Sequence, residues 1–334
     1  MDLFPSPEQE LLVATARDFA ARTVTTKRVR ALEAGESGFD DAHWRAMVDL
    51  GWAELAPLEL ALVAESLGAA ALPSPLVITG ALRNAVPAAV AGLPPEAVVT
   101  LASLVPRARD EWSGPFPRGA PTLTGSYLLV PYASAASVIV AATGDGLVAV
   151  EPSHGGVASS RESVVGGDAS FRVDFMDAHA TPIDGTIGAA LDHVSVIALA
   201  YAVGAAQGAL DLSVQHARDR HQFGRPIGSF QAVAHRCADM VAEVDACRLL
   251  AYRAAWALTD DAENAEFAVR SALGYAKDAL RRVAMHAHQV HGAIGFSSEH
   301  DLHLFTRRIK AFELTAGSTA LHQERFATAI GLRA

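Results

Sequence analysis

Basic residues and cysteines are scarce in this sequence. The 27 lysines and arginines are outnumbered by 37 aspartates and glutamates, and the formal net charge is −10. Nucleic-acid binding depends on a basic stripe that neutralises phosphates, so this balance argues against a nucleic-acid partner. The two cysteines, Cys237 and Cys247, are ten positions apart on what reads as one helix, too far for a disulfide along that helix. We therefore expect reduced core cysteines in a cytosolic protein.

The sequence predicts neither a secretory signal nor a membrane anchor. The sequence starts MDLFPSPEQELL, with acidic and proline residues instead of a basic segment followed by an apolar run, so we expect a cytoplasmic location. The stretch 194–212 is apolar, but it is alanine-rich, contains Ser195 and Gln207, and has no lysine or arginine just before it. This composition favours a buried bundle helix over a membrane span.

What the chain does have is length and apolar content. With 334 residues, of which 51% are hydrophobic and 19% are charged, it can bury a large core in two or three domains. Residues 6–86 have the i, i+3, i+4 spacing of helices, and Ser6 resembles a helix start. From 97 to 173, short valine, leucine and isoleucine runs alternate with glycine, proline and serine, as in strands.

Long helical patterns return after residue 185. They predict a bundle of four helices, near 188–218, 227–258, 262–291 and 318–330. Gly204 and Gly208, one turn apart in the first of them, permit close contact with another helix. We therefore predict a mostly α fold with a central β domain. Its parts are a helical domain over 1–92, a small β barrel or sandwich over 93–184 and a helical bundle over 185–334.

The most specific local pattern lies between the first two bundle helices. The segment 218–231 reads RDRHQFGRPIGSFQ, and it resembles the R-x-Q-F-G-x-P-I-x-x-F-Q motif of the acyl-CoA dehydrogenase family without a break over twelve positions. The resemblance covers essentially the whole chain, because that family has the same order of helical domain, β domain and helical bundle. A solvated loop between two helices is the structural alternative for the segment.

The resemblance implies a role in binding FAD. In that family the arginine and glutamine of this loop reach across a subunit interface to the diphosphate and adenosine of the neighbour's FAD. A guanidinium suits a diphosphate because its planar donors can engage two oxygens. Arg220 is the residue expected to take that role, with Gln222 and Gln231 as hydrogen-bonding partners and Phe223 as an apolar wall.

A second segment, 289–296, reads QVHGAIGF and resembles the family's Q-x-x-G-G-x-G turn. Glycines in such a turn let backbone amides approach the diphosphate of a flavin cofactor. The resemblance implies cofactor contacts from Gln289, Gly292 and Ala293, although Ala293 stands where the family has its second glycine. A helix C-terminal cap is the structural alternative for the turn.

Histidines are frequent near this turn, and such a group could suggest a metal site. His288 and His291 share a helical face, and no cysteine or trio of carboxylates completes a ligand set. We expect surface or interface histidines and no metal. The remaining members of the group are His286, His300 and His303.

The residue that performs the family's chemistry is missing. Dehydrogenation of an acyl-CoA removes the α-hydrogen as a proton, which needs a carboxylate base, and the β-hydrogen as a hydride to the flavin. Family members place the glutamate in one of two positions. Ala316 occupies the first in this sequence, and Val194 occupies the second when residues are counted back without gaps from Arg220. Neither side chain can accept a proton.

Other parts of the family's active site are also missing. The T-E-P-x-x-G-S-D loop and the W-I-T strand that face the flavin ring have no clear match, and residues 101–106 and 128–132 occupy their places. The N-terminal domain is shortened, because residues 52–57 run almost directly into the next helix and omit the glycine-rich loop that edges the acyl pocket in the family. The two motifs that would contact the FAD of a neighbouring subunit are retained, while the motifs of the chain's own active site are missing.

This pattern resembles the non-catalytic subunit of bacterial α2β2 acyl-CoA dehydrogenases that degrade steroid side chains. The resemblance implies an acyl-CoA substrate and FAD held jointly with a catalytic acyl-CoA dehydrogenase subunit, and it suggests an electron-transferring flavoprotein as acceptor. Two alternatives stay open at this point. One is an autonomous homotetrameric dehydrogenase with a relocated base, for which Glu313 and Asp192 are the nearest candidates. The other is a flavin-free structural or regulatory homologue.

Overall fold

The computed structural model describes residues 5–106, 112, 114, 116–118 and 121–332. The outermost residues of the predicted ranges 1–92 and 185–334, and part of 93–184, lie outside this description. The N-terminal part is helical, as predicted. Its first helix begins at Ser6, whose side chain accepts from the Gln9 backbone N–H while the Gln9 side chain accepts from the Ser6 N–H. The helices are α1 (Pro7–Thr23), α2 (Thr26–Ala34), α3 (Asp41–Asp49), α4 (Pro57–Ala69), α5 (Leu76–Ala85) and α6 (Pro87–Val90).

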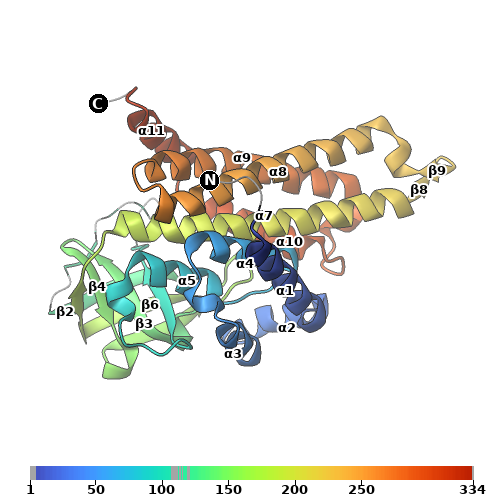
Figure 1. Ribbon diagram of the computed structural model, residues 1–334. Coiled ribbons are helices and arrows are strands. Elements are labelled where there is room, and N and C mark those ends of the chain that lie inside the picture. Colours follow the sequence, from blue (N-terminus) through green and yellow to red (C-terminus); the bar gives the residue numbers. More distant parts are fainter. Residues whose placement is uncertain (1–4, 107–111, 113, 115, 119–120, 333–334) are drawn as a thin grey trace.

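The central part forms two sheets, which agrees with the expected β domain (Figure 1). One sheet has the order β1-β3-β4-β7 and the other the order β2-β6-β5. The buried Tyr127 hydroxyl of β2 donates to the Ala142 carbonyl of β3 and so joins the two sheets. The strands are β1 (Val98–Ala102), β2 (Thr122–Pro131), β3 (Ala136–Thr143), β4 (Gly146–Val150), β5 (Val157–Glu162), β6 (Ser170–His179) and β7 (Thr181–Ile183).

The C-terminal part is a helical bundle with one more helix than the sequence suggested. The predicted helices are present as α7 (Ile187–Asp219), α8 (Gln231–Asp260), α9 (Ala265–His291) and α11 (Thr319–Ala329). Helix α10 (Leu302–Thr315) was not predicted, although it buries an apolar face of Leu302, Leu304, Phe305, Ile309 and Phe312. Both cysteines lie on α8 as expected, and both are free thiols.

Helix α7 is the axis of the molecule and packs against α4, α5, α8, α9 and α10 (Figure 1). Glycines allow its close contact with α4. A Cβ at Gly204 would lie 1.9 Å from the Glu65 carbonyl oxygen, and a Cβ at Gly68 of α4 would lie 2.0 Å from the Tyr201 carbonyl oxygen. Real side chains do not approach that closely, so only glycine fits at these crossing points. The close packing predicted for Gly204 is confirmed.

By length and composition alone, α7 is also the one described helix that could cross a membrane. More than half of its most apolar stretch is buried inside the protein, against five neighbouring helices. A bundle core explains its apolar character, as the sequence indicated.

Candidate functional site

The first motif forms a hairpin at the far end of the α7–α8 pair, which projects away from the β domain (Figure 1). Strands β8 (His221–Gln222) and β9 (Arg225–Pro226) are joined by Phe223 and Gly224, whose φ angles are 53° and 77°. Two central residues with positive φ match the twist of a two-residue hairpin. A bulky residue in this conformation is strained, and such strain is most often retained where function requires it.

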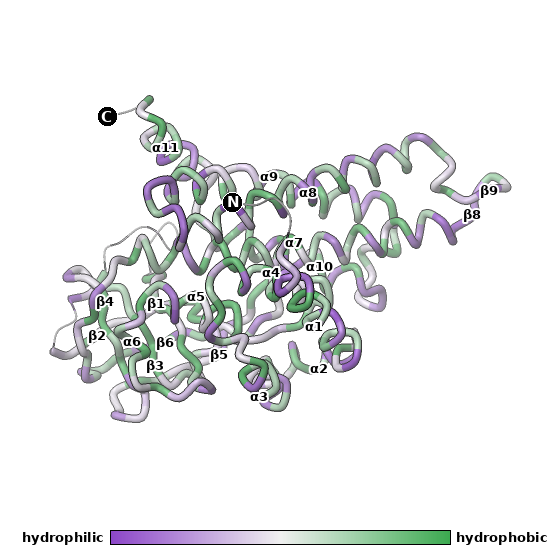
Figure 2. Tube along the Cα trace, in the orientation of Figure 1, coloured by the Kyte–Doolittle hydropathy of each residue, from purple (hydrophilic) through white to green (hydrophobic). Residues whose placement is uncertain are grey.

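The hairpin tip presents Phe223 to solvent. Its side chain is 93% exposed, and its ring meets the Phe230 ring edge-on, while the Arg225 guanidinium lies 4.1 Å above that second ring. The apolar wall predicted at Phe223 is therefore displayed outward. Figure 2 shows hydrophilic residues on the end of α7 beside it.

The structure brings the second motif to the same end of the bundle. His216 near the end of α7 stacks on His291 at the end of α9, with ring centroids 4.7 Å apart, and Arg236 of α8 lies 3.0 Å from His286 of α9. The turn η5 (Gly292–Phe296) follows directly. The hairpin and the turn, about 70 positions apart in sequence, therefore lie at one surface.

The polar residues at this surface are available to a ligand. Arg220, Gln222, Gln231 and Gln289 are all exposed. Among the described residues, the side chains of Arg220, Gln231 and Gln289 have no hydrogen-bond or ion-pair partner, and Gln222 donates only to the adjacent His221 carbonyl. Unengaged guanidinium and amide groups are the donors that a diphosphate and an adenosine need, so this surface fits that half of FAD.

The turn η5 adds an open stretch of backbone. Gly292 has a φ of 61°, and a Cβ there would meet nothing within 4 Å. Ala293 is exposed as well, so its methyl group does not close the turn. Phe296 beside it is 77% exposed and stacks on His288. Exposed large apolar side chains gathered at one end of a molecule mark an interaction surface.

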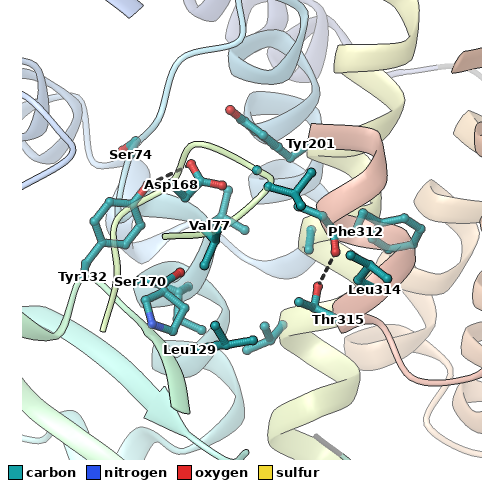
Figure 3. A pocket seen from close by; sticks show the side chains of 18 of the residues that line it. Ser74, Val77, Leu129, Tyr132, Asp168, Ser170, Tyr201, Phe312, Leu314 and Thr315 are labelled. Carbon is teal, nitrogen blue, oxygen red and sulfur yellow. Dashed lines mark hydrogen bonds between the residues drawn. The ribbon is translucent and has the colours of Figure 1, made fainter. Parts of the chain in front are cut away.

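A cavity of about 400 Å³ lies at the other end of α7, between α5, α7, α10 and the β domain (Figure 3). From α7 it is lined by Val194, Ala198 and Tyr201, and from the predicted flavin-ring region by Leu129 and Pro131. Arg220 is nineteen positions after Tyr201, a separation of about 28 Å along a helix. The cavity and the projecting hairpin are therefore separate sites within one chain.

Both expected base positions lie at or near this cavity and carry no acid. Val194 lines it, and Ala316 follows Thr315, another lining residue, at the end of α10. The Ala316 side chain is only 3% exposed. The turn after it is closed by Lys277 of α9, which donates to the Glu313 carbonyl, and by His322 of α11, which contacts the Ala316 carbonyl.

The two carboxylates considered as relocated bases are engaged elsewhere. Asp192 binds Arg270 through both oxygens, at 2.5 and 2.6 Å, and the Arg270 side chain is 1% exposed. Glu313 pairs with Lys310 on the outside of α10. Neither carboxylate lines the cavity, so the structure does not place them where a substrate carbon could be reached.

The acidic side chain that does line the cavity is Asp168, which the sequence did not single out. It ends the loop between β5 and β6, and the Tyr132 hydroxyl donates to its Oδ1 at 3.2 Å (Figure 3). Burial raises the pKa of the Asp168 carboxyl, although the nearby Arg308 charge acts in the opposite direction. The only sequence signal was an aspartate after two glycines, which is equally typical of a surface turn.

The histidines near η5 pack with one another and with neighbouring residues. His291 lies between His216 and His300, with ring centroids at 4.7 and 4.8 Å, and His288 contacts Thr306. Burial lowers the pKa of His291 to about 4. Within the described residues, no group of three or more histidine, cysteine, aspartate or glutamate side chains has the arrangement of a metal site.

Comparisons with known proteins agree with this fold. Residues 186–331 match the family model for the acyl-CoA dehydrogenase C-terminal domain. The acyl-CoA dehydrogenase IpdE2 of Mycobacterium tuberculosis is 32% identical over 91% of each chain, and that of Mycolicibacterium smegmatis is 30% identical over 91% of this chain and 92% of the relative.

Two solved structures are similar over nearly the whole chain. The ChsE4-ChsE5 complex of M. tuberculosis gives a TM-score of 0.86 at 24% identity and full coverage of both chains. The Tcur3481-Tcur3483 steroid acyl-CoA dehydrogenase variant gives 0.85 at 24% identity, covering 97% of this chain and 98% of that one.

Proposed function

Because this chain belongs to the acyl-CoA dehydrogenase family, a family of flavin-dependent oxidoreductases, we propose that it is the non-catalytic subunit of a hetero-oligomeric acyl-CoA dehydrogenase. It supplies the adenosine and diphosphate half of the FAD site of a catalytic partner and carries no base of its own. The observation that supports this proposal most directly is a difference between two parts of the chain. Val194 and Ala316 occupy the base positions, whereas the projecting hairpin exposes hydrogen-bond donors that have no partner among the described residues.

The geometry supports a contribution to a neighbour's cofactor. Arg220 lies about 28 Å along α7 from Tyr201 at the chain's own cavity, so we assign it and the donors beside it to a site completed by another subunit. Arg220 would bind the diphosphate, Gln222, Gln231 and Gln289 would bind it or the adenosine, and Gly292 and Ala293 would offer backbone amides. Bound FAD would supply hydride acceptance. The exposed Phe223 would pack against cofactor or partner.

The partner and substrate follow from the relatives by analogy. The solved relatives are a two-component complex and a steroid acyl-CoA dehydrogenase, so we propose an α2β2 heterotetramer in the cytoplasm acting on a steroid side-chain CoA thioester. An electron-transferring flavoprotein is the proposed acceptor. The acyl-CoA would bind in the partner's active site.

A second candidate has one observation in its favour. Asp168 is a carboxyl in a largely apolar cavity with a raised pKa, which is the environment of a general base. An autonomous dehydrogenase could use it in place of the family's glutamate.

Flavin titration of the purified chain separates the two candidates. We expect the chain alone to bind FAD weakly and to turn over no acyl-CoA at saturating FAD, because it encodes half of a cofactor site. A homo-oligomer with one FAD per chain and turnover that is lost in Asp168→Asn would establish the second candidate instead.

A further inference from the structure

The proposed function assigns no ligand to the cavity beside Asp168, because it involves only the donors that complete a partner's cofactor site. We infer that it binds an apolar ligand bearing one hydroxyl group, which hydrogen-bonds to the Asp168 carboxyl. The inference rests on the proposed function, because it treats the cavity as a site that binds its ligand without converting it. It adds a second ligand to the assembly, held by this chain alone.

The size and walls of the cavity suit such a ligand. Its volume of about 400 Å³ falls in the range of pockets that enclose small organic molecules, about 300–1,000 Å³. The lining side chains are mainly aliphatic and come from α5, α7, α10 and the loop after β5. No lysine or arginine is among them, so a hydrocarbon body is favoured over a phosphate or a CoA moiety. Examples are Val77, Ile78, Val165, Val194, Ala198 and Leu314.

Polar side chains line several sides of the cavity, and its one acidic lining residue, Asp168, lies beside Tyr132 (Figure 3). Tyr201 is fully engaged, because it donates to the Leu72 carbonyl at 3.0 Å and accepts from Arg308 Nε at 2.8 Å. Tyr132 donates to Oδ1 of Asp168 at 3.2 Å. Among the described residues, Oδ2 of Asp168 takes part in no hydrogen bond. That oxygen is therefore available to a ligand.

The chemistry of this carboxyl selects a hydroxyl. When Asp168 is ionised, Oδ2 accepts from a ligand O–H, and when it is protonated it can donate to the same oxygen. A carbonyl would pair with the protonated form alone. A carboxylate would meet like charge from the ionised form of Asp168 and from Glu33, which pairs with Arg307 and Arg308 behind it. An alcohol fits in both protonation states.

A matched pair of probes tests the inference. The steroid alcohol androstanol and its parent hydrocarbon androstane differ by the hydroxyl group. Their affinity for the full-length chain would be measured by equilibrium dialysis with detection by mass spectrometry. We expect androstanol to bind more tightly, and Asp168→Leu to weaken it about tenfold, the effect of one hydrogen bond to a charged or polar group, while androstane binding changes little. Asp168→Asn should retain most of the preference.

Three controls keep the result interpretable. Asp184→Leu replaces an exposed aspartate away from the cavity and should leave both probes unaffected. Ala198→Phe fills the cavity and should abolish binding of both. Thermal unfolding of each variant checks that it folds. If Asp168→Leu does not fold, the affinities of Asp168→Asn and Ala198→Phe for the two probes are used to test the inference.

Equal affinity for the two probes, or an unchanged androstanol affinity in Asp168→Leu, would overturn the inference and leave the shared FAD site untouched. Displacement of androstanol by FAD from the chain alone would place a flavin ring in the cavity, and both proposals would then fail. Weaker FAD binding in an Arg220 variant of the complex, with androstanol binding intact, is expected if both proposals are right.

Discussion

Replacement of Arg220 by alanine tests the cofactor role of the projecting hairpin. The Arg220 side chain is exposed and has no hydrogen-bond or ion-pair partner among the described residues, while its backbone N–H caps α7 and its carbonyl accepts from Ile227. Alanine keeps both backbone contacts. The substitution should therefore leave the unfolding temperature of the chain nearly unchanged, and any effect should fall on what the guanidinium binds.

The expected effect on FAD is large. A charge-assisted contact to a diphosphate is worth roughly 1.5–3 kcal/mol, which corresponds to about 10- to 100-fold in the dissociation constant of FAD. Hydride transfer at the far end of the cofactor should be intact, so activity should recover as FAD is raised. Arg220→Lys should restore part of the affinity, because one ammonium cannot match the planar fork.

The assay is titration of the apo complex with FAD, followed by flavin fluorescence and by turnover at saturating FAD. Arg218→Ala is the matched control, since Arg218 is also exposed and unpaired among the described residues but lies two positions away, where residues do not share a helical face. FAD affinity in Arg220→Ala equal to that of Arg218→Ala would show that the hairpin is structural and refute the site assignment.

Four further predictions concern the fold, the excluded bases and the pH dependence of stability. Asp192→Ala should destabilise the chain by about 3–5 kcal/mol in denaturant unfolding, because it leaves the buried Arg270 charge with only the exposed Glu266 carboxylate, 3.9 Å away. Glu313→Gln should change both stability and turnover of the complex only slightly. A fall of about 100-fold in turnover for Glu313→Gln would revive Glu313 as a base. Gly204→Ala should be strongly destabilising or prevent folding, since its Cβ would lie 1.9 Å from a backbone oxygen, and a thermal midpoint within a degree or two of the parent would contradict the helix contact. Burial lowers the pKa of His322 to about 4, so between about pH 6.5 and 4 the unfolded chain binds more protons than the folded chain, and stability is lost as the pH falls through that window. The free energy of unfolding of His322→Gln should therefore depend less steeply on pH in that window than that of the parent. Parallel profiles for the two proteins would argue against a lowered pKa of His322.

Much of the fold could be predicted because local patterns and tertiary packing agree. The helical period of α7, α8 and α9 could be read to within a few residues at each end, and Gly204 indicated a close helix contact, which the structure shows to be with α4. The α10 helix was missed, and its buried face carries a charge that only tertiary partners explain, because Arg308 binds Glu33 and Tyr201.

Only those parts of the site that lie in contiguous motifs could be predicted from the sequence. Arg220 and Gln222 belong to a contiguous motif that can be read from the sequence, and the absence of acids at Val194 and Ala316 could be read in the same way. Asp168 could not, because its environment is made by Tyr132, Tyr201 and α10, which come from distant parts of the chain. Burial and partners of a single carboxyl are properties of the tertiary structure.

Counting flavin in the assembled complex tests the central claim most directly. The chain would be co-expressed with an acyl-CoA dehydrogenase subunit that carries both the base glutamate and the flavin-ring loop, and FAD would be quantified by absorbance against the concentration of each subunit. The account predicts one FAD per heterodimer, and a large loss of that flavin with Arg220→Ala in this chain at limiting FAD. Two FAD per heterodimer, or full flavin content in the partner without this chain, would contradict it.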